Sequence, residues 1–178
     1  MNLRFCKSWK ILHLGLAWLL WGVGELAAQP KILFIGNSFT LGSADAADRA
    51  AASGGVPGIF DRLVQAGGHA NPTTVMRAVG GTDFQFHSGD ATTRNTIASQ
   101  PWDYVVLQNY SIEPTHLVDG SHSLADHYTY GADLYRRVLA NNPVTQVILY
   151  ETWSRAEAHA LISGVSSSSS FASTAEFQ

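Results

Sequence analysis

The chain has 178 residues, one cysteine and a formal net charge of -3. This length suits a single domain, and the weakly acidic balance lacks the basic excess that nucleic-acid-binding proteins usually carry. A disulfide within the chain is excluded because Cys6 has no second cysteine to pair with. No spacing of cysteine and histidine matches a structural zinc site, so we expect no metal ion.

The N-terminus has the pattern of a secretory signal peptide. Three basic residues within the first ten precede an apolar run over residues 11–23, and the small-residue stretch "GELAAQ" follows. A membrane-spanning helix needs about 20 apolar residues, which is longer than this run. We therefore predict a signal peptide over residues 1–28, cleaved near Ala27 or Ala28, and a secreted or periplasmic protein with no membrane attachment afterwards. An uncleaved anchor is the alternative.

Strands and helices alternate through the first half of the remaining chain. The apolar run at residues 31–35 predicts a strand, and the stretch at 42–55, rich in alanine, glycine, serine and aspartate, predicts a loop or an irregular helix. Residues 57–66 ("PGIFDRLVQA") have apolar side chains at helical spacing, a proline in the first turn and two glycines after the last. β-Branched residues at 73–79 predict a second strand, which a pair of glycines ends.

The second half continues the alternation. A short helix is expected over 92–99, because a proline follows it, and a strand over 104–108 ("YVVLQ"). Residues 124–140 predict the longest helix, which "NNP" ends, and residues 146–150 ("QVILY") predict the fourth strand. A further helix is expected over 155–162.

This order of elements predicts a flavodoxin-like, three-layer α/β/α fold with a mostly parallel sheet. The runs "ILFI", "YVVL" and "VILY" are apolar throughout, as is typical of parallel strands covered on both faces. Ligands of such sheets bind beyond the carboxyl ends of the strands. The loops that begin at Gly36, Gly80, Gln108 and Glu151 should therefore face one crevice.

Ser38 stands in the first of these loops, two residues after Gly36. A serine hydroxyl there can act as a nucleophile, provided that a base takes its proton and that donors stabilise the oxyanion. The sequence "GNS" is equally typical of a simple turn. A phosphate-binding loop is disfavoured, because neither Lys-Ser/Thr nor G-x-G-x-x-G follows.

Three segments of the chain resemble the motif blocks of the SGNH hydrolases, also called GDSL-type esterases. "ILFIGNSFT" resembles the first block, which carries the nucleophilic serine, and "AVGGTDFQFH" resembles the second. "WDYVVLQNYS" resembles the third block, with Gln108 where most members have the asparagine of G-x-N-D. Glutamine takes this place in the sialate O-acetylesterase-like branch of the family.

The resemblance implies an SGNH hydrolase domain over residues 31–163 that needs no cofactor. It implies that Ser38 is the nucleophile, and that the Ser38 amide, the Gly81 amide and the Gln108 side chain form the oxyanion hole, with Gly80 as an alternative to Gly81. The implied reaction is hydrolysis of a small-molecule or carbohydrate ester, such as an O-acetyl group on a sugar.

The chain departs from the family in its general base. The family places its histidine in a D-x-x-H motif after the last strand, and no such motif follows Tyr150. Residues 164–178 contain a serine run and are expected to form a flexible tail. We therefore expect a fragment that is incomplete at the C-terminus and lacks the catalytic Asp and His.

An internal D-x-x-H at Asp119 and His122 gives second-choice base candidates, although these residue types also suit a helix-entry loop. The competing hypothesis is a non-catalytic ligand- or carbohydrate-binding protein with the same fold.

Overall fold

The computed structural model of the protein describes residues 28–42, 54–115, 123–152, 162, 171 and 173–177. Its centre is a four-stranded parallel sheet with the strand order β2-β1-β3-β4. The strands are β1 (Lys31–Gly36), β2 (Thr73–Ala78), β3 (Tyr104–Leu107) and β4 (Gln146–Leu149). All four predicted strands are confirmed to within one residue at each end, and so is the parallel α/β architecture.

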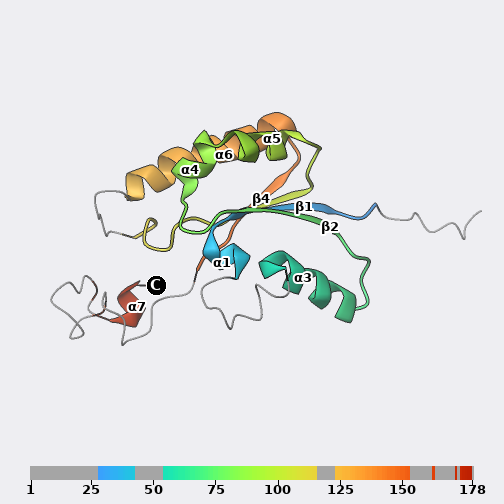
Figure 1. Ribbon diagram of the computed structural model, residues 1–178, viewed down its shortest axis with the longest axis horizontal. Coiled ribbons are helices and arrows are strands. Elements are labelled where there is room, and N and C mark those ends of the chain that lie inside the picture. The colour runs from blue at the N-terminus through green and yellow to red at the C-terminus, as the bar shows by residue number, and fades with distance from the viewer. Residues whose placement is uncertain are drawn as a thin grey trace, which may run out of the picture.

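Helices lie on both faces of this sheet (Figure 1). One face carries α4 (Phe84–Gly89), α5 (Ala91–Ala98) and α6 (Leu124–Asn141). The other face carries α1 (Ser38–Leu41) and α3 (Gly55–Ala66), and α7 (Thr174–Phe177) lies near the C-terminus. The three helices predicted over 57–66, 92–99 and 124–140 correspond to α3, α5 and α6. The arrangement is the predicted three-layer α/β/α fold.

Side-chain caps define where the helices of the first face begin. Asp83, Asp90 and Ser123 each accept a hydrogen bond from the backbone N–H three residues further on. Such a cap satisfies one of the N–H groups that a helix leaves without an intrahelical partner. The sequence-based prediction missed α4, although the aspartate that caps it was a usable signal. It also assigned α1 to a loop.

The main hydrophobic core lies between the sheet and helices α4 to α6. Leu33 pairs with Val105, and Ile35 pairs with Leu107, so that these four side chains share one face of the sheet. They pack with buried side chains from the helices and from the approach to β3, namely Phe84, Ile97, Trp102, Leu134 and Val138. This face of the sheet therefore holds the fold together.

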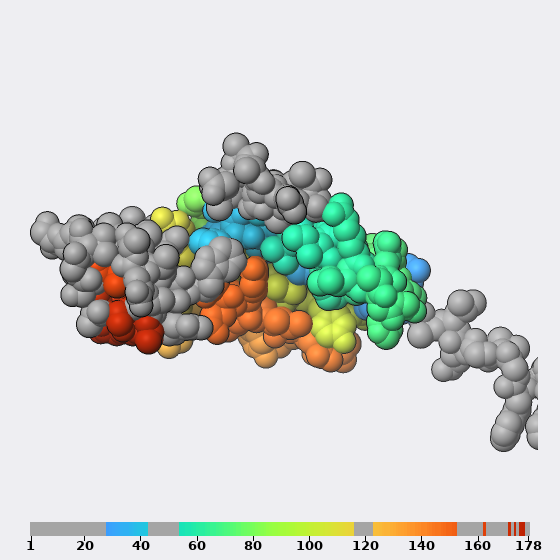
Figure 2. Space-filling model, turned by 90° about the horizontal axis from the view of Figure 1, so that it is seen from below, coloured from blue at the N-terminus to red at the C-terminus, as the bar shows by residue number. Residues whose placement is uncertain are grey.

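The opposite face is covered only in part. Phe34 of β1 contacts Phe60 of α3, with ring centroids 6.2 Å apart. However, Leu63 of α3 is 67% exposed and Ile148 of β4 is 45% exposed. Figure 2 views the molecule from this side, where both α3 (blue-green) and the orange segment that contains β4 reach the surface. The expectation that both faces are fully covered is therefore met only on the α6 side among the described residues.

Several sequence-based predictions fall on other parts of the chain. The predicted signal peptide before Ala28, the stretch over residues 43–53 and most of the predicted helix over 155–162 lie outside the described residues. In the predicted flexible tail, Phe171 is buried against Ile112 and Ile162. No helix among the described residues is long and apolar enough to cross a membrane.

Two leucines test the core assignment. Leu134 of α6 has no exposed surface, whereas Leu63 of α3 is 67% exposed. Leu134→Ala should lower the free energy of unfolding by about 2–5 kcal/mol, because it removes buried methyl groups and leaves a cavity. The matched change Leu63→Ala should cost under about 0.5 kcal/mol. Urea unfolding measures both, and equal losses would contradict the assignment of the core to the α6 side.

Candidate active site

The loop after β1 brings Ser38 to the carboxyl edge of the sheet. Gly36 ends β1, and Ser38 is the first residue of α1. The side chain of Asn37 caps this short helix by accepting a hydrogen bond from the Phe39 N–H at 3.1 Å. A turn of helix therefore starts directly after the strand, with Ser38 in its first turn.

Asn37 joins the three predicted motif segments to one another. Its backbone N–H donates to Gln108 Oε1 at 2.9 Å, and its Nδ2 donates to the Thr82 carbonyl at 2.9 Å. Asn37 is only 1% exposed, so these bonds are shielded from water. The loops after β1, β2 and β3, which contain Ser38, Gly81 and Gln108, are therefore fastened together as the sequence predicts for a shared crevice.

Gly36 permits the close approach on which this arrangement depends. A Cβ atom at Gly36 would lie 2.2 Å from Thr40 Oγ1 and 2.7 Å from Gln108 Oε1. Neither distance is compatible with a side chain larger than hydrogen. The glycine after the first strand is thus required by the packing of Thr40 and Gln108 against the backbone.

Gln108 is buried and supports the serine loop. Its Oε1 accepts from the Asn37 N–H and from the Thr40 hydroxyl, at 2.9 and 3.0 Å. Because a backbone N–H can only donate, this contact fixes which end of the amide is oxygen. Nε2 then donates one proton to the Asn109 carbonyl. The predicted oxyanion role of Gln108 therefore depends on its second Nε2 proton.

Gly81 lies in a turn at the same edge. It has a φ of 73°, a conformation that favours glycine, and it is exposed. The Thr82 hydroxyl donates to the Val79 carbonyl at 2.8 Å and closes the turn. The Val79 N–H donates to the Gly36 carbonyl at 3.0 Å, which ties the turn to the end of β1.

Ser38 is partly exposed, and its hydroxyl has no hydrogen-bond partner among the described residues. Asp119 and His122, the second-choice base candidates, lie outside the described residues. The structure thus shows the surroundings of the predicted nucleophile without assigning it a base. Nor does any group of three or more metal-binding side chains occur within the described ranges.

A fully buried histidine, His87, lies behind the serine loop. Its Nε2 is 2.9 Å from the Gly36 carbonyl and 3.3 Å from Thr82 Oγ1. The Thr82 hydroxyl donates its proton to the Val79 carbonyl, so both neighbours of His87 Nε2 are acceptors. His87 Nε2 therefore carries a proton. Sequence reasoning gave no role to this histidine, which lies in the second motif segment.

The other ring nitrogen of His87 shares one hydroxyl with Asp90. Thr93 Oγ1 lies 3.0 Å from His87 Nδ1 and 2.8 Å from Asp90 Oδ2, and it has a single proton to donate. That proton is donated to the Asp90 carboxylate, and burial lowers the pKa of His87, which favours a neutral ring. The hydrogen bond from Arg77 lowers the pKa of Asp90 well below its usual range, so the carboxylate is ionised.

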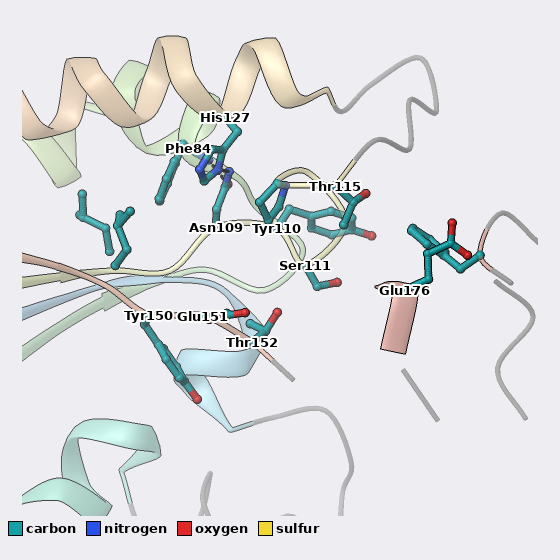
Figure 3. Close-up of a pocket in the computed structure, with 14 residues that line it drawn as sticks. Phe84, Asn109, Tyr110, Ser111, Thr115, His127, Tyr150, Glu151, Thr152 and Glu176 are labelled. Carbon is teal, nitrogen blue, oxygen red and sulfur yellow. Dashed lines mark hydrogen bonds between the residues drawn. The ribbon is translucent and has the colours of Figure 1, made fainter. Parts of the chain in front are cut away.

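A cavity of about 440 Å³ opens beyond the ends of β3 and β4 (Figure 3). Asn109, His127 and Tyr150 are among the residues that line it, and Figure 3 shows Asn109 and His127 on the α6 side. Ser38 is not among the lining residues. The Asn109 carbonyl nevertheless connects the two places, because it accepts from Asn37 Nδ2 at 3.4 Å.

Replacement of Gly36 tests the geometry of the serine loop. Gly36→Ala should lower the free energy of unfolding by roughly 1–3 kcal/mol, because the added methyl group overlaps Thr40 and Gln108. Gly80→Ala is the matched control, since a Cβ atom there meets nothing within 4 Å. Thermal and urea unfolding provide the measurement. A stable Gly36→Ala protein would mean that Gln108 does not pack against this loop.

The buried His87 predicts a pH-dependent stability. Its pKa is lowered in the folded state, whereas the unfolded chain should have the ordinary value of about 6.5. Below about pH 6.5 the unfolded state therefore binds the proton first, and the free energy of unfolding should fall by at most ~1.4 kcal/mol per pH unit. Above that pH this histidine makes no further contribution.

His87→Gln is the variant for this measurement, because its amide can still donate to the Gly36 carbonyl. Urea unfolding between pH 5 and 8 should give a shallower slope for His87→Gln than for the wild type. The pKa of His127 is lowered as well, so only the difference between the two proteins reports on His87. Parallel curves would show that His87 is not held neutral by burial.

No family model and no curated protein sequence matches the chain. Among solved structures, a GDSL-like lipase from Parabacteroides merdae ATCC 43184 aligns with a TM-score of 0.55 and 18% identity, covering 84% of this chain and 69% of that chain. TesA aligns with a TM-score of 0.50 and 14% identity, covering 67% of this chain and 58% of its own. The chain therefore spans less than two thirds of TesA. At such identities the likeness concerns the fold, and this protein has the α/β fold of the GDSL-type, or SGNH, hydrolases.

Proposed function

We propose that the protein is an exported SGNH-type serine esterase whose nucleophile is Ser38. The observation that carries this proposal is the set of bonds from Asn37, which fastens the serine loop to Gln108 and to the turn after β2. Nucleophile and oxyanion donors must converge on one reacting group, and these three loops meet at one edge of the sheet. The GDSL-type fold agrees with this assignment.

In this reaction, the Ser38 oxygen attacks the acyl carbon of an ester. The carbonyl oxygen becomes an oxyanion, which the Ser38 amide, the Gly81 amide and the second Nε2 proton of Gln108 would stabilise. The intermediate then expels the alcohol, and water hydrolyses the acyl-serine. The family resemblance implies that the base is a D-x-x-H pair located after the last strand. Within this chain, Asp119 and His122 are the second-choice candidates for that role.

The cavity beside the serine loop supports a small, uncharged ester as substrate. Aromatic and hydroxyl side chains line it, including Tyr110, Tyr150 and Ser111, and none of the described lining residues is a lysine or an arginine. Such walls suit the apolar faces and hydroxyl groups of a sugar. An O-acetyl group on a carbohydrate is the substrate class that we propose.

A second candidate function is ligand or carbohydrate binding without catalysis. It is favoured by one observation, namely that no described residue makes a hydrogen bond with the Ser38 hydroxyl. A serine without a base is a weak nucleophile. The cavity could then bind the same ligands without cleaving them.

Acetylation by p-nitrophenyl acetate tests the nucleophile. The p-nitrophenolate group leaves without a proton, whereas hydrolysis of the acyl-serine requires an activated water molecule. In the 178-residue chain we therefore expect low steady-state turnover, little changed by Ser38→Ala, together with slow accumulation of one acetyl group on Ser38. Peptide mass spectrometry locates the acetyl group, and Ser99→Ala is a surface control.

Acetyl groups spread over lysines with none on Ser38 would contradict the proposed nucleophile. Fast turnover that Ser38→Ala abolishes would show that a base is present in the chain. His122→Ala and Asp119→Asn would then determine whether the internal D-x-x-H pair supplies it. The absence of both turnover and an acetyl group on Ser38 would favour the binding function for this chain.

A further inference from the structure

The side-chain amide of Asn109 has a fixed orientation. Its Oδ1 accepts a hydrogen bond from the backbone N–H of Phe84 at 2.8 Å. A backbone N–H can only donate, so the oxygen of this amide must face Phe84. Asn109 is 7% exposed, and the two protons of its Nδ2 therefore point to the other side, within the protein.

Both Nδ2 protons of Asn109 have acceptors. One is donated to the carboxylate of Glu113, a residue with no exposed surface. The other is available to His127 Nδ1, which lies 2.9 Å from Asn109 Nδ2. Since Nδ2 can only donate, His127 Nδ1 must accept, and it therefore carries a lone pair. The ring of His127 is then neutral, with its proton on Nε2.

Two observations agree with a neutral ring. The imidazole stacks on Phe84, with ring centroids 5.5 Å apart and an interplanar angle of 25°. Burial also lowers the pKa of His127. The contacts with Asn109 and Phe84 thus determine both the plane of the ring and the nitrogen that carries the proton.

We propose that His127 is a ligand-binding residue that donates its Nε2–H to an uncharged acceptor oxygen in the cavity. His127 is part of the cavity wall, and no described residue accepts a proton from Nε2. Asn109 and Glu113 serve as positioning residues behind it. The tautomer follows from the hydrogen bonds alone, whereas the cavity as a ligand site rests on the proposed function.

The charges around the cavity select against anions. Among the described residues, the charged side chains that line it are Glu151 and Glu176, and the neutral His127 supplies no positive charge. A carboxylate or phosphate would therefore lose its hydration without gaining a cationic partner. A neutral oxygen, such as a sugar hydroxyl or an ester carbonyl, requires only the N–H donor.

The protonation state is measured by NMR of the full chain with ¹⁵N-labelled histidine. At pH 7 His127 should show a protonated Nε2 and a bare Nδ1, assigned by comparison with His127→Gln. Asn109→Asp replaces the donor by a carboxylate, which should move a proton to Nδ1 and raise the pKa of His127 by roughly one unit or more. Asn95→Asp adds the same charge at an exposed site and should leave this pKa unchanged.

Binding is measured with a matched pair of probes, methyl β-glucopyranoside and methyl β-glucopyranosiduronate. The uronate should bind several-fold more weakly than the neutral glucoside. His127→Phe keeps the stack on Phe84 but removes the donor, and it should weaken glucoside binding roughly fivefold. His127→Gln keeps an N–H donor and should stay within about twofold of the wild type.

Three results would overturn the proposal. One is a His127 that carries a proton on Nδ1 at pH 7. Another is an affinity for the glucoside that His127→Phe leaves unchanged. The third is a glucoside that binds no more tightly than the uronate, which includes the case in which neither binds. Binding of these two methyl glycosides involves no ester cleavage, so a failure of the proposed esterase chemistry would leave these results unchanged.

Discussion

The carboxyl edge of the sheet depends on the hydrogen bonds of one buried residue, Asn37. Its backbone N–H reaches Gln108 after β3, and its side chain reaches the Thr82 carbonyl after β2 and the Phe39 N–H of α1 after β1. A buried polar group that loses its partner costs about 1–3 kcal/mol. The loops cannot therefore separate one at a time without leaving such groups unpaired. The predicted nucleophile is held in a rigid frame, although Ser38 itself makes none of these side-chain bonds.

Two histidines beside this frame are held neutral for different purposes. His87 is enclosed completely, and both of its ring nitrogens have protein partners in Gly36, Thr82 and Thr93. It acts as a structural link between the end of β1 and the start of α5. Among the described residues, His127 has a partner on Nδ1 only, and it borders the cavity. The difference in partners, rather than in burial alone, distinguishes a structural histidine from one that can bind a ligand.

The sequence was sufficient for the strands, because β1, β3 and β4 are largely apolar runs and β2 is rich in β-branched residues. It was insufficient for α4, whose "FQFHSG" has no helical periodicity and whose Asp83 cap was overlooked. The convergence of the motif segments could be predicted from the parallel topology. The orientation of Gln108 could not, since it depends on Asn37, which lies 71 positions away in the chain. The tautomer of His127 likewise depends on the contact between Asn109 and Phe84, 25 positions apart.

Asn109 links the serine loop to the cavity. Its carbonyl accepts from Asn37 Nδ2 and from Gln108 Nε2, while its side chain bonds to Phe84 and His127. The backbone of this residue therefore belongs to the frame around the proposed nucleophile, and its amide group belongs to the wall of the cavity that we propose binds a ligand. A ligand that shifts the ring of His127 would also shift Asn109, whose carbonyl accepts the hydrogen bond from Gln108 Nε2. Because these contacts are buried and directional, the orientation of His127 at the cavity and the geometry of Gln108, the proposed oxyanion donor, cannot vary independently.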